Sequence, residues 1–240
     1  MGGKDPEVEA AFHKLMVQRL GEGGLKANRP FEALMDSKIT TLNGGRKMEE
    51  KTTKKQVIVI LGSPRKKGNS AILAEQISKG VRSTGAKVET IFLQGLKIAP
   101  CKSCYACQKH NSQGCATKDD MQSLYLKLIK ADAWVISSPV YWFTMSAQTK
   151  IFMDRCFALP AYAKNPFLGK RIAIAMSYGD KDPFISGCVN ALRTFQDAFR
   201  YTGSKMVGMV YGSAMKAGEI KLNEALMQEA ENLGERLVKK

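Results

Sequence analysis

Short runs of apolar residues alternate with helix-length amphipathic stretches from Gln56 onward, and this alternation restricts the fold more than any other feature of the chain. The apolar runs lie at 57–61, 87–93, 133–136, 171–177 and 205–211. The stretches expected to form helices lie at 69–83, 119–130, 144–158, 184–201 and 219–239. Such alternation is typical of βαβ units around a parallel sheet. We therefore predict an α/β fold with a doubly wound five-stranded parallel sheet of order 2-1-3-4-5, which binds ligands beyond the carboxyl ends of its strands.

The 240 residues allow one such domain, which we place at 56–240, and an N-terminal helical extension with a linker at 1–55. Asp5 as N-cap, Pro6 at the first helical position and Gly21 beyond the end predict a helix in the extension. Apolar residues recur at helical spacing between them, so this face must be buried against the domain's own surface or a second subunit, and we favour the second subunit. The charged, polar stretch that follows is typical of a linker or a surface arm.

The chain carries a net charge of +15, and residues 57–240 contribute most of it, with 26 basic against 14 acidic residues. A basic domain attracts nucleotide phosphates, acidic redox partners and nucleic acid alike, so the charge alone identifies no partner. Because no nucleic-acid-binding motif is present, a basic nucleic-acid-binding protein is the weaker, non-enzymatic alternative. We also expect a cytoplasmic protein without a membrane span, since no apolar run has the necessary length and the first thirty residues lack a signal core.

Residues 62–70 follow the first predicted strand and lead into a predicted helix, so backbone N–H groups at the helix N-terminus would face an anion. Donors and a turn-forming glycine suited to phosphate occur at Ser63, Arg65, Lys67, Gly68, Asn69 and Ser70. The segment lacks both the Gly-Lys-Ser/Thr ending of a Walker loop and the Gly-x-Gly-x-x-Gly fingerprint. The alternative is a polar loop in which Asn69 caps the helix. The position in the first βα connection favours a phosphate site.

Two further segments follow predicted strands and could contact a planar ring. The first is an aromatic run comprising Pro139, Val140, Tyr141, Trp142 and Phe143. The second, after the fourth strand, comprises Ser177, Tyr178 and Gly179. Aromatic clusters more often belong to the core, but this run abuts turn residues at a carboxyl strand end. We assign no catalytic residue, because redox chemistry at such a site belongs to the cofactor, and we give no role to His13 or His110.

Four cysteines fall within the segment 100–118, which we call the cysteine loop. They have the spacing C-x2-C-x2-C-x7-C and are Cys101, Cys104, Cys107 and Cys115. Thiols at two-residue intervals can surround an iron–sulfur cluster. A zinc site, a degenerate loop without metal and a thiol redox role are the alternatives, whereas disulfides are disfavoured in a reducing cytosol. Cys156 and Cys188 lie outside the motif and are expected to be small buried residues.

These motifs resemble those of NADPH-dependent FMN reductases and iron–sulfur flavoproteins, which have a flavodoxin-like fold. The resemblance covers about residues 57–212. It includes Gly-Ser-Pro-Arg-x-x-Gly-Asn-Ser after the first strand, Pro-Val-Tyr-Trp before a Lys-x-x-x-Asp-Arg helix, and the cysteine motif. It implies FMN, with Ser63, Arg65, Asn69 and Ser70 on the phosphate and 139–143 against the isoalloxazine through backbone groups. It also implies a [4Fe–4S] cluster in a homodimer or homotetramer, with the cluster of one subunit near the flavin of a neighbour. The resemblance also places the helix with Lys150, Asp154 and Arg155 against the isoalloxazine. The alternative is that these three residues are structural.

We therefore expect an FMN-dependent oxidoreductase in which a donor such as ferredoxin passes electrons through the cluster to FMN and on to a small-molecule acceptor. The alternative is an NAD(P)H-dependent FMN or quinone reductase in which NAD(P)H is a substrate and the cysteines hold no cluster.

Overall fold

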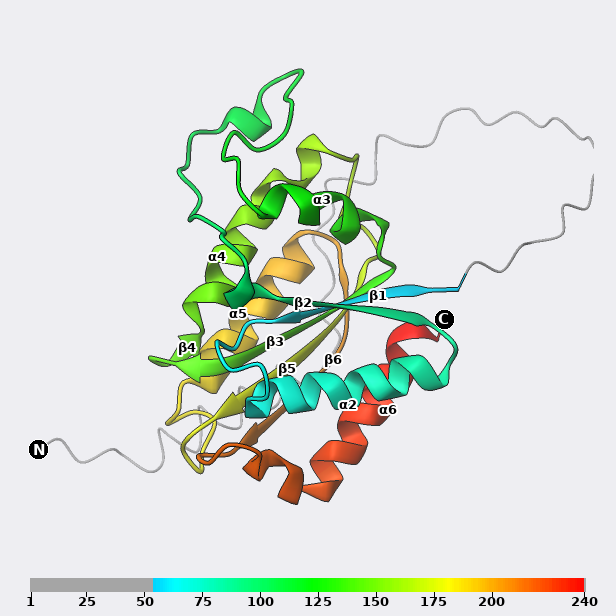
Figure 1. The fold of residues 1–240 in the computed structure, drawn as a ribbon, viewed down its shortest axis with the longest axis vertical. Helices are drawn as coiled ribbons and strands as arrows, with labels where there is room; N and C mark the ends of the chain where they lie inside the picture. The colour runs from blue at the N-terminus through cyan, green and yellow to red at the C-terminus, as the bar shows by residue number, and fades with distance from the viewer. Residues whose placement is uncertain (1–53, 240) are drawn as a thin grey trace, which may run out of the picture. The chain divides into compact units, whose positions relative to one another are not determined.

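The structure is a computed structural model that describes residues 54–239 (Figure 1). The helix expected between Asp5 and Gly21, with its subunit contact, lies outside these residues. The strands are β1 (Gln56–Leu61), β2 (Lys87–Phe92), β3 (Ala133–Tyr141), β4 (Thr144–Met145), β5 (Arg171–Tyr178) and β6 (Lys205–Ser213). The α-helices are α2 (Asn69–Ser83), α3 (Met121–Lys130), α4 (Ala147–Arg155), α5 (Cys188–Tyr201) and α6 (Glu224–Val238). The 3-10 helices are η2 (Leu93–Gly95), η3 (Ala106–Gln108), η4 (Cys156–Ala161) and η5 (Glu219–Leu222).

The main sheet is parallel and has the strand order β2-β1-β3-β5-β6. This confirms the predicted flavodoxin-like order, because the short β4 is an addition outside that path. The central register places Val57 of β1 opposite both Val88 of β2 and Ala133 of β3. The carboxyl ends of β1, β3 and β5 consequently meet at one edge of the sheet, where the fold class binds its ligands.

Each face of the sheet carries its own core. Ile58 and Ile60 of β1 pack with side chains of α3, α4 and α5, whereas Val57 and Val59 pack with those of α2 and α6. Figure 1 shows the two helix layers on opposite sides of the sheet. Strands buried on both faces explain the nearly continuous apolar runs in the sequence. Each fully buried aliphatic side chain contributes about 1.5–3 kcal/mol by its removal from water.

Helices α2 and α6 pack closely because each has a glycine at the contact. A Cβ at Gly80 would collide with the carbonyl oxygen of Glu231, and a Cβ at Gly234 would collide with that of Ile77. The two helices therefore approach at a distance that no larger residue permits at either position. None of the helices within 54–239 combines the length and the apolarity that a membrane crossing requires.

Several element boundaries differ from the predicted ones. The third strand continues past residue 136 to Tyr141, because Val140 and Tyr141 pair with β4 in a hairpin that the sequence did not reveal. The helix expected at 144–158 is limited to α4, since Ser146 caps its start and the 3-10 helix η4, which contains Pro160, follows its end. The helix expected from 184 begins at Cys188. The helix expected from 219 is divided into the 3-10 helix η5 and α6, which begins at Glu224.

Candidate functional site

The β1–α2 loop (62–68) leads directly into the first turn of α2. Ser63 is buried, and its Oγ accepts a hydrogen bond from the N–H of Arg65 at 3.0 Å. The N–H of Gly68 donates to the Arg65 carbonyl at 3.0 Å and closes the turn. No side chain caps α2, so its N–H groups and the positive end of its dipole remain available.

Basic side chains surround this helix N-terminus. Arg65, Lys66 and Lys67 are exposed. Lys66, Lys67 and Lys221, with Glu75 as the one acidic member, also line a groove of about 420 Å³ beside the start of α2. A Cβ at Gly68 would lie 3.0 Å from Ser63 Oγ, so glycine allows the loop to close over this serine. Positive side chains and backbone donors together form an environment that attracts an anion.

The Ser70 hydroxyl is the clearest sign that a ligand belongs here. Ser70 is 1% exposed, yet its Oγ has no hydrogen-bond partner among residues 54–239. A buried polar group without a partner costs about 1–3 kcal/mol, and each such group in a native protein requires an explanation. A phosphate at the N-terminus of α2 would supply the missing acceptor. The residues of this loop therefore fit the phosphate group of FMN.

Asn69, in contrast, uses its whole side chain for another purpose. Its Nδ2 donates to the carbonyls of Ala214 at 3.3 Å and Lys216 at 2.9 Å. Its Oδ1 accepts a hydrogen bond from the N–H of Gly218 at 2.9 Å. The side chain thus ties the loop after β6 to the start of α2, which leaves only the backbone N–H of Asn69 for an anion.

Beneath the β1–α2 loop lies a small set of polar contacts that joins three segments. Ser146 Oγ donates to the Gly62 carbonyl at 2.7 Å, and the Gly62 N–H donates to the Ser137 carbonyl at 2.8 Å. The N–H of Ser146 donates to Ser138 Oγ at 2.9 Å. A Cβ at Gly62 would collide with Thr149 Oγ1, so only glycine fits between the loop and α4. These contacts fix the loop relative to the end of β3 and the start of α4.

The aromatic run 139–143 spans the end of β3 and the turn of a hairpin with β4. Trp142 and Phe143 occupy its turn with φ of 47° and 64°, and they are 91% and 56% exposed. Asn190 Nδ2 donates to the Phe143 carbonyl at 3.2 Å, and a Cβ at Gly187 would lie 2.5 Å from that oxygen. A non-glycine residue at positive φ is uncommon and indicates a constrained turn. The exposure contradicts the core alternative for these two rings.

The third predicted segment lies beside the hairpin strand. Ser177 at the end of β5 is in register with Pro139 of β3. Tyr178 is buried, and this burial raises its pKa to about 12. Its carbonyl accepts a hydrogen bond from the N–H of Ala214 at 2.8 Å, and a Cβ at Gly179 would lie 2.7 Å from Met215 Sδ. The structure thus brings the segments predicted to bind a flavin to one edge of the sheet.

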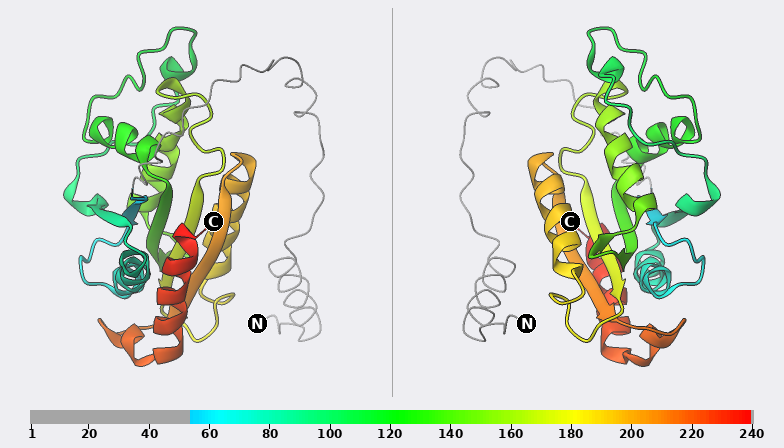
Figure 2. Two further views of the ribbon diagram at one scale, coloured as in Figure 1. Left: turned by 90° about the vertical axis from the view of Figure 1, so that its right-hand side faces the viewer. Right: turned by 90° about the vertical axis from the view of Figure 1, so that its left-hand side faces the viewer.

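The cysteine loop lies at the other end of α4. Figures 1 and 2 both show it projecting from the end of the domain opposite η5. Cys101 and Cys104 are exposed, whereas Cys107 and Cys115 are partly buried against the core beside α3 and α4. No three His, Cys, Asp or Glu side chains within 54–239 are gathered as a metal site requires. The donor set itself, four thiols in one loop, fits an iron–sulfur cluster or zinc.

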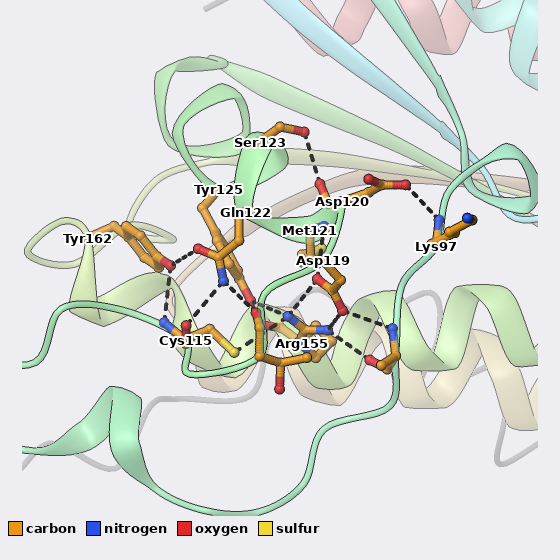
Figure 3. Close-up of polar contacts among 12 residues, drawn as sticks. Lys97, Cys115, Asp119, Asp120, Met121, Gln122, Ser123, Tyr125, Arg155 and Tyr162 are labelled. Carbon is orange, nitrogen blue, oxygen red and sulfur yellow. Dashed lines mark hydrogen bonds and ion pairs between the residues drawn. The ribbon is translucent and has the colours of Figure 1, made fainter.

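Arg155 at the end of α4 reaches the base of this loop (Figure 3). It is 1% exposed, and its two terminal nitrogens contact the Asp119 carboxylate at 2.5 and 3.1 Å. Nη1 also donates to the Ala99 carbonyl at 2.8 Å, and Nη2 lies 3.5 Å from Cys115 Sγ. The guanidinium therefore contacts both the segment that enters the loop and the segment that leaves it.

The pKa of the Cys115 thiol reflects this environment. Partial burial raises it, but hydrogen bonds from the Thr117 N–H and the Tyr125 hydroxyl and the charge of Arg155 outweigh the burial. The resulting pKa lies below the ordinary value of a thiol. The environment thus makes the thiolate, the form in which cysteine binds metals, easier to reach at Cys115.

Uncharged side chains complete the attachment of the loop (Figure 3). The Tyr162 hydroxyl accepts a hydrogen bond from the Cys115 N–H at 3.1 Å and donates to Gln122 Oε1 at 3.0 Å. Gln122 Nε2 donates to the carbonyls of Cys115 at 3.1 Å and Thr117 at 2.6 Å. A Cβ at Gly114, whose φ is +96°, would collide with the Tyr162 ring. These contacts fix the end of the loop while its other cysteines remain near the surface.

Sequence reasoning missed Asp119, Gln122, Ser146 and Tyr162, and left Arg155 open between two roles. Each is a single polar residue whose partners lie in other segments, so no spacing rule identifies it. Arg155 alone gave a signal, because it lies three residues after the buried Phe152 and therefore on the same helix face.

Comparisons with known proteins agree with this arrangement. The sequence model of the NADPH-dependent FMN reductase family matches residues 56–201. An iron-sulfur flavoprotein of Archaeoglobus fulgidus is 39% identical over 123 residues, which span 51% of this chain and 61% of that protein. A second iron-sulfur flavoprotein of the same organism is 30% identical over 186 residues, or 76% of this chain and 78% of that protein.

Among solved structures, the NAD(P)H:quinone oxidoreductase from Methanothermobacter marburgensis has a TM-score of 0.60 at 19% identity. The match covers 78% of this chain and 99% of that one, and at this identity it shows a common fold. The sequence match to the family, in contrast, extends over more than half of the chain and includes the β1–α2 loop, the cysteine loop and α4. The chain therefore belongs to the NADPH-dependent FMN reductase family.

Proposed function

We propose that this protein is an FMN-dependent oxidoreductase in which electrons pass between a [4Fe–4S] cluster held by the cysteine loop and FMN held at the carboxyl edge of the sheet. The observation that carries the flavin site is the buried, unpartnered hydroxyl of Ser70 at the uncapped N-terminus of α2. The cluster assignment rests on the four thiols of one loop and on the names of the two archaeal relatives.

The β1–α2 loop would bind the phosphate of FMN. Ser63, Arg65, Lys67 and Ser70 supply side-chain donors or positive charge, and Gly68 and Asn69 supply backbone N–H groups. Residues 139–143 and 177–179 would hold the ring through backbone groups at the ends of β3 and β5. Bound FMN supplies the redox chemistry, and fixed N–H donors at its ring would tune the potential.

The cluster would be held by Cys101, Cys104, Cys107 and Cys115. Metal sites rarely exist fully formed before the metal binds, and Cys115 is already fixed by Tyr162 and Gln122. When bound, a cluster supplies one-electron steps. Helix α4 separates the cysteine loop from the β1–α2 loop within one chain. This separation supports electron transfer between subunits of a dimer or tetramer, in which the loop of one chain lies near the flavin of another.

The donor would be NAD(P)H or an acidic ferredoxin-type protein, and the acceptor a small molecule. The excess of basic residues in 57–240 favours an acidic partner, because opposite charges accelerate association. A cytoplasmic location belongs to the same proposal, since thiols remain reduced there.

A second candidate is an NAD(P)H-dependent FMN reductase without a cluster. The family match favours it, and so do the dispersed positions of the four sulfurs, two of which are exposed. In that case FMN would accept a hydride directly from NAD(P)H, and the cysteine loop would serve another purpose.

Anaerobic purification and reconstitution with iron and sulfide test the proposal. We expect one FMN and four irons per chain, and a loss of iron in Cys104→Ala. Cys188→Ala is the matched control, because it removes a thiol outside the loop and should retain the iron. Iron-free yellow protein that oxidises NADPH would support the second candidate. Salt-dependent nucleic-acid binding without flavin would contradict both candidates.

A further inference from the structure

We propose that Arg155 is a positioning residue that raises the reduction potential of the group bound at Cys115, by donating a hydrogen bond and a buried positive charge to that sulfur. This inference rests on the proposed iron–sulfur function of the cysteine loop.

The placement of Arg155 is the first argument. Its guanidinium lies at the end of α4, almost wholly buried, and Nη2 is 3.5 Å from Cys115 Sγ. An electrostatic interaction is stronger in such an environment than at the surface. Asp119 balances the charge of Arg155, but the N–H groups of Ala99 and Met121 also donate to that carboxylate at 2.9 and 3.1 Å. The carboxylate therefore interacts with two backbone donors as well as with Arg155, and it neutralises the charge of Arg155 only in part.

The second argument is that one N–H group of the guanidinium is unpaired. Arg155 Nε is buried and has no hydrogen-bond partner among residues 54–239. A purely structural ion pair would gain nothing from an unpaired buried N–H, which costs free energy. An electron-rich group added at Cys115 would supply acceptors beside this guanidinium. Nη2 already contacts Cys115 Sγ and Nε is unpaired, so the guanidinium retains donor capacity for such a group.

The effect on the potential follows from general chemistry. Hydrogen bonds to ligand sulfur and positive charge nearby stabilise the reduced, more negative form of an iron–sulfur centre. Loss of the Arg155 charge should therefore lower the potential. Loss of the Asp119 charge should raise it, because Arg155 then stays uncompensated. A role limited to holding the fold predicts no such opposite pair of shifts.

The test is potentiometry, monitored by electron paramagnetic resonance, of the reconstituted full-length protein and its variants. We expect Arg155→Gln to shift the reduced-to-oxidised ratio at a fixed ambient potential about tenfold toward oxidised, which is about 59 mV for a one-electron couple. Asp119→Asn should shift the ratio toward reduced, and Arg155→Lys should lie between wild type and Arg155→Gln. Arg193→Gln is the matched control, since Arg193 pairs with Asp197 at 2.7 Å on the exposed face of α5.

Thermal unfolding of each variant separates misfolding from a change in potential. Should Arg155→Gln not fold, an upward shift in Asp119→Asn together with a downward shift in Arg155→Lys decides the question. Shifts of the same sign in all three variants, or none beyond that of Arg193→Gln, would overturn the inference. Wild-type protein without iron would instead overturn the proposed function on which the inference rests.

Discussion

The side-chain oxygen of Asn69 accepts a hydrogen bond from the backbone N–H of Gly218 at 2.9 Å, across a sequence separation of 149 residues. Through this contact the first helix of the domain is joined to the loop that follows its last strand. The sequence suggested that the Asn69 side chain binds phosphate or caps α2, and the structure shows a third use.

Asn69→Ala should therefore act mainly on the stability of the protein and less on its affinity for FMN. Loss of three hydrogen bonds to the 214–218 loop should lower the free energy of unfolding by about 1–3 kcal/mol. Urea denaturation measures this change, with Asn232→Ala on the exposed face of α6 as control. Wild-type stability in Asn69→Ala would contradict this structural role of the side chain.

Ser70→Ala should have the opposite profile. Because Ser70 Oγ has no partner within 54–239, its removal should leave the free energy of unfolding unchanged or slightly higher. Loss of a donor to a charged phosphate should weaken FMN binding about tenfold, or about 1.4 kcal/mol. Fluorescence titration with FMN measures the affinity. Ser78→Ala is the matched control, since Ser78 is also buried in α2 but donates to the Ala74 carbonyl at 2.7 Å. Equal affinities in the two variants would remove Ser70 from the site.

The glycines between α2 and α6 provide a test of packing. Gly80→Ala and Gly234→Ala each place a methyl group against a backbone carbonyl of the opposite helix, so we expect a loss of about 1–3 kcal/mol from each. Gly95→Ala is the control, because the added Cβ would lie 3.3 Å from the Phe92 ring, which can adjust. Differential scanning calorimetry should show lower melting temperatures for the first two variants only.

Asp132 should contribute to stability against acid. Partial burial raises its pKa, but the Gln56 N–H at 2.8 Å and Lys55 Nζ at 2.9 Å outweigh this and hold the pKa below its usual value. For an acid with a lowered pKa in the folded state, the stabilisation is full above the unfolded pKa of about 4 and disappears as the pH falls through the folded pKa.

The free energy of unfolding should consequently fall more steeply below about pH 4 in wild type than in Asp132→Asn. Denaturation at a series of pH values measures both slopes. Asp197→Asn is the control, because it removes the same charge from an exposed ion pair with Arg193. Parallel profiles for wild type and Asp132→Asn would show that this carboxylate is not coupled to folding.

The strand order could be predicted, and so could the meeting of the candidate flavin-binding segments at one edge of the sheet, because both follow from the local alternation of apolar runs and helical stretches. The hairpin at Trp142 could not, since two adjacent bulky residues at positive φ give no turn signal of the Asn-Gly type. Ser146 escaped prediction for another reason. Its contacts with Gly62 and Ser138 depend on chain segments that meet only after the sheet has formed.

The cysteine motif was visible as a spacing, but its attachment to the domain was not. Arg155 and Asp119 are separated by 36 residues and Ala99 by 20 more, so the cluster of charges at the base of the loop has no local signature. The extension at 1–55 was predicted as a helix and a linker, and this remains a prediction because it lies almost wholly outside the described residues.

Helix α4 sets the distance between the two candidate sites. Ser146 at its N-cap hydrogen-bonds to the turn that follows β1, and Arg155, its last residue, hydrogen-bonds to the base of the cysteine loop. A helix of nine residues places these two residues about 13 Å apart along its axis. One inserted residue would rotate Arg155 by roughly 100° away from its partners, since a turn takes 3.6 residues. An insertion or deletion within α4 should therefore disturb the contacts at one of its ends even if every side chain is kept.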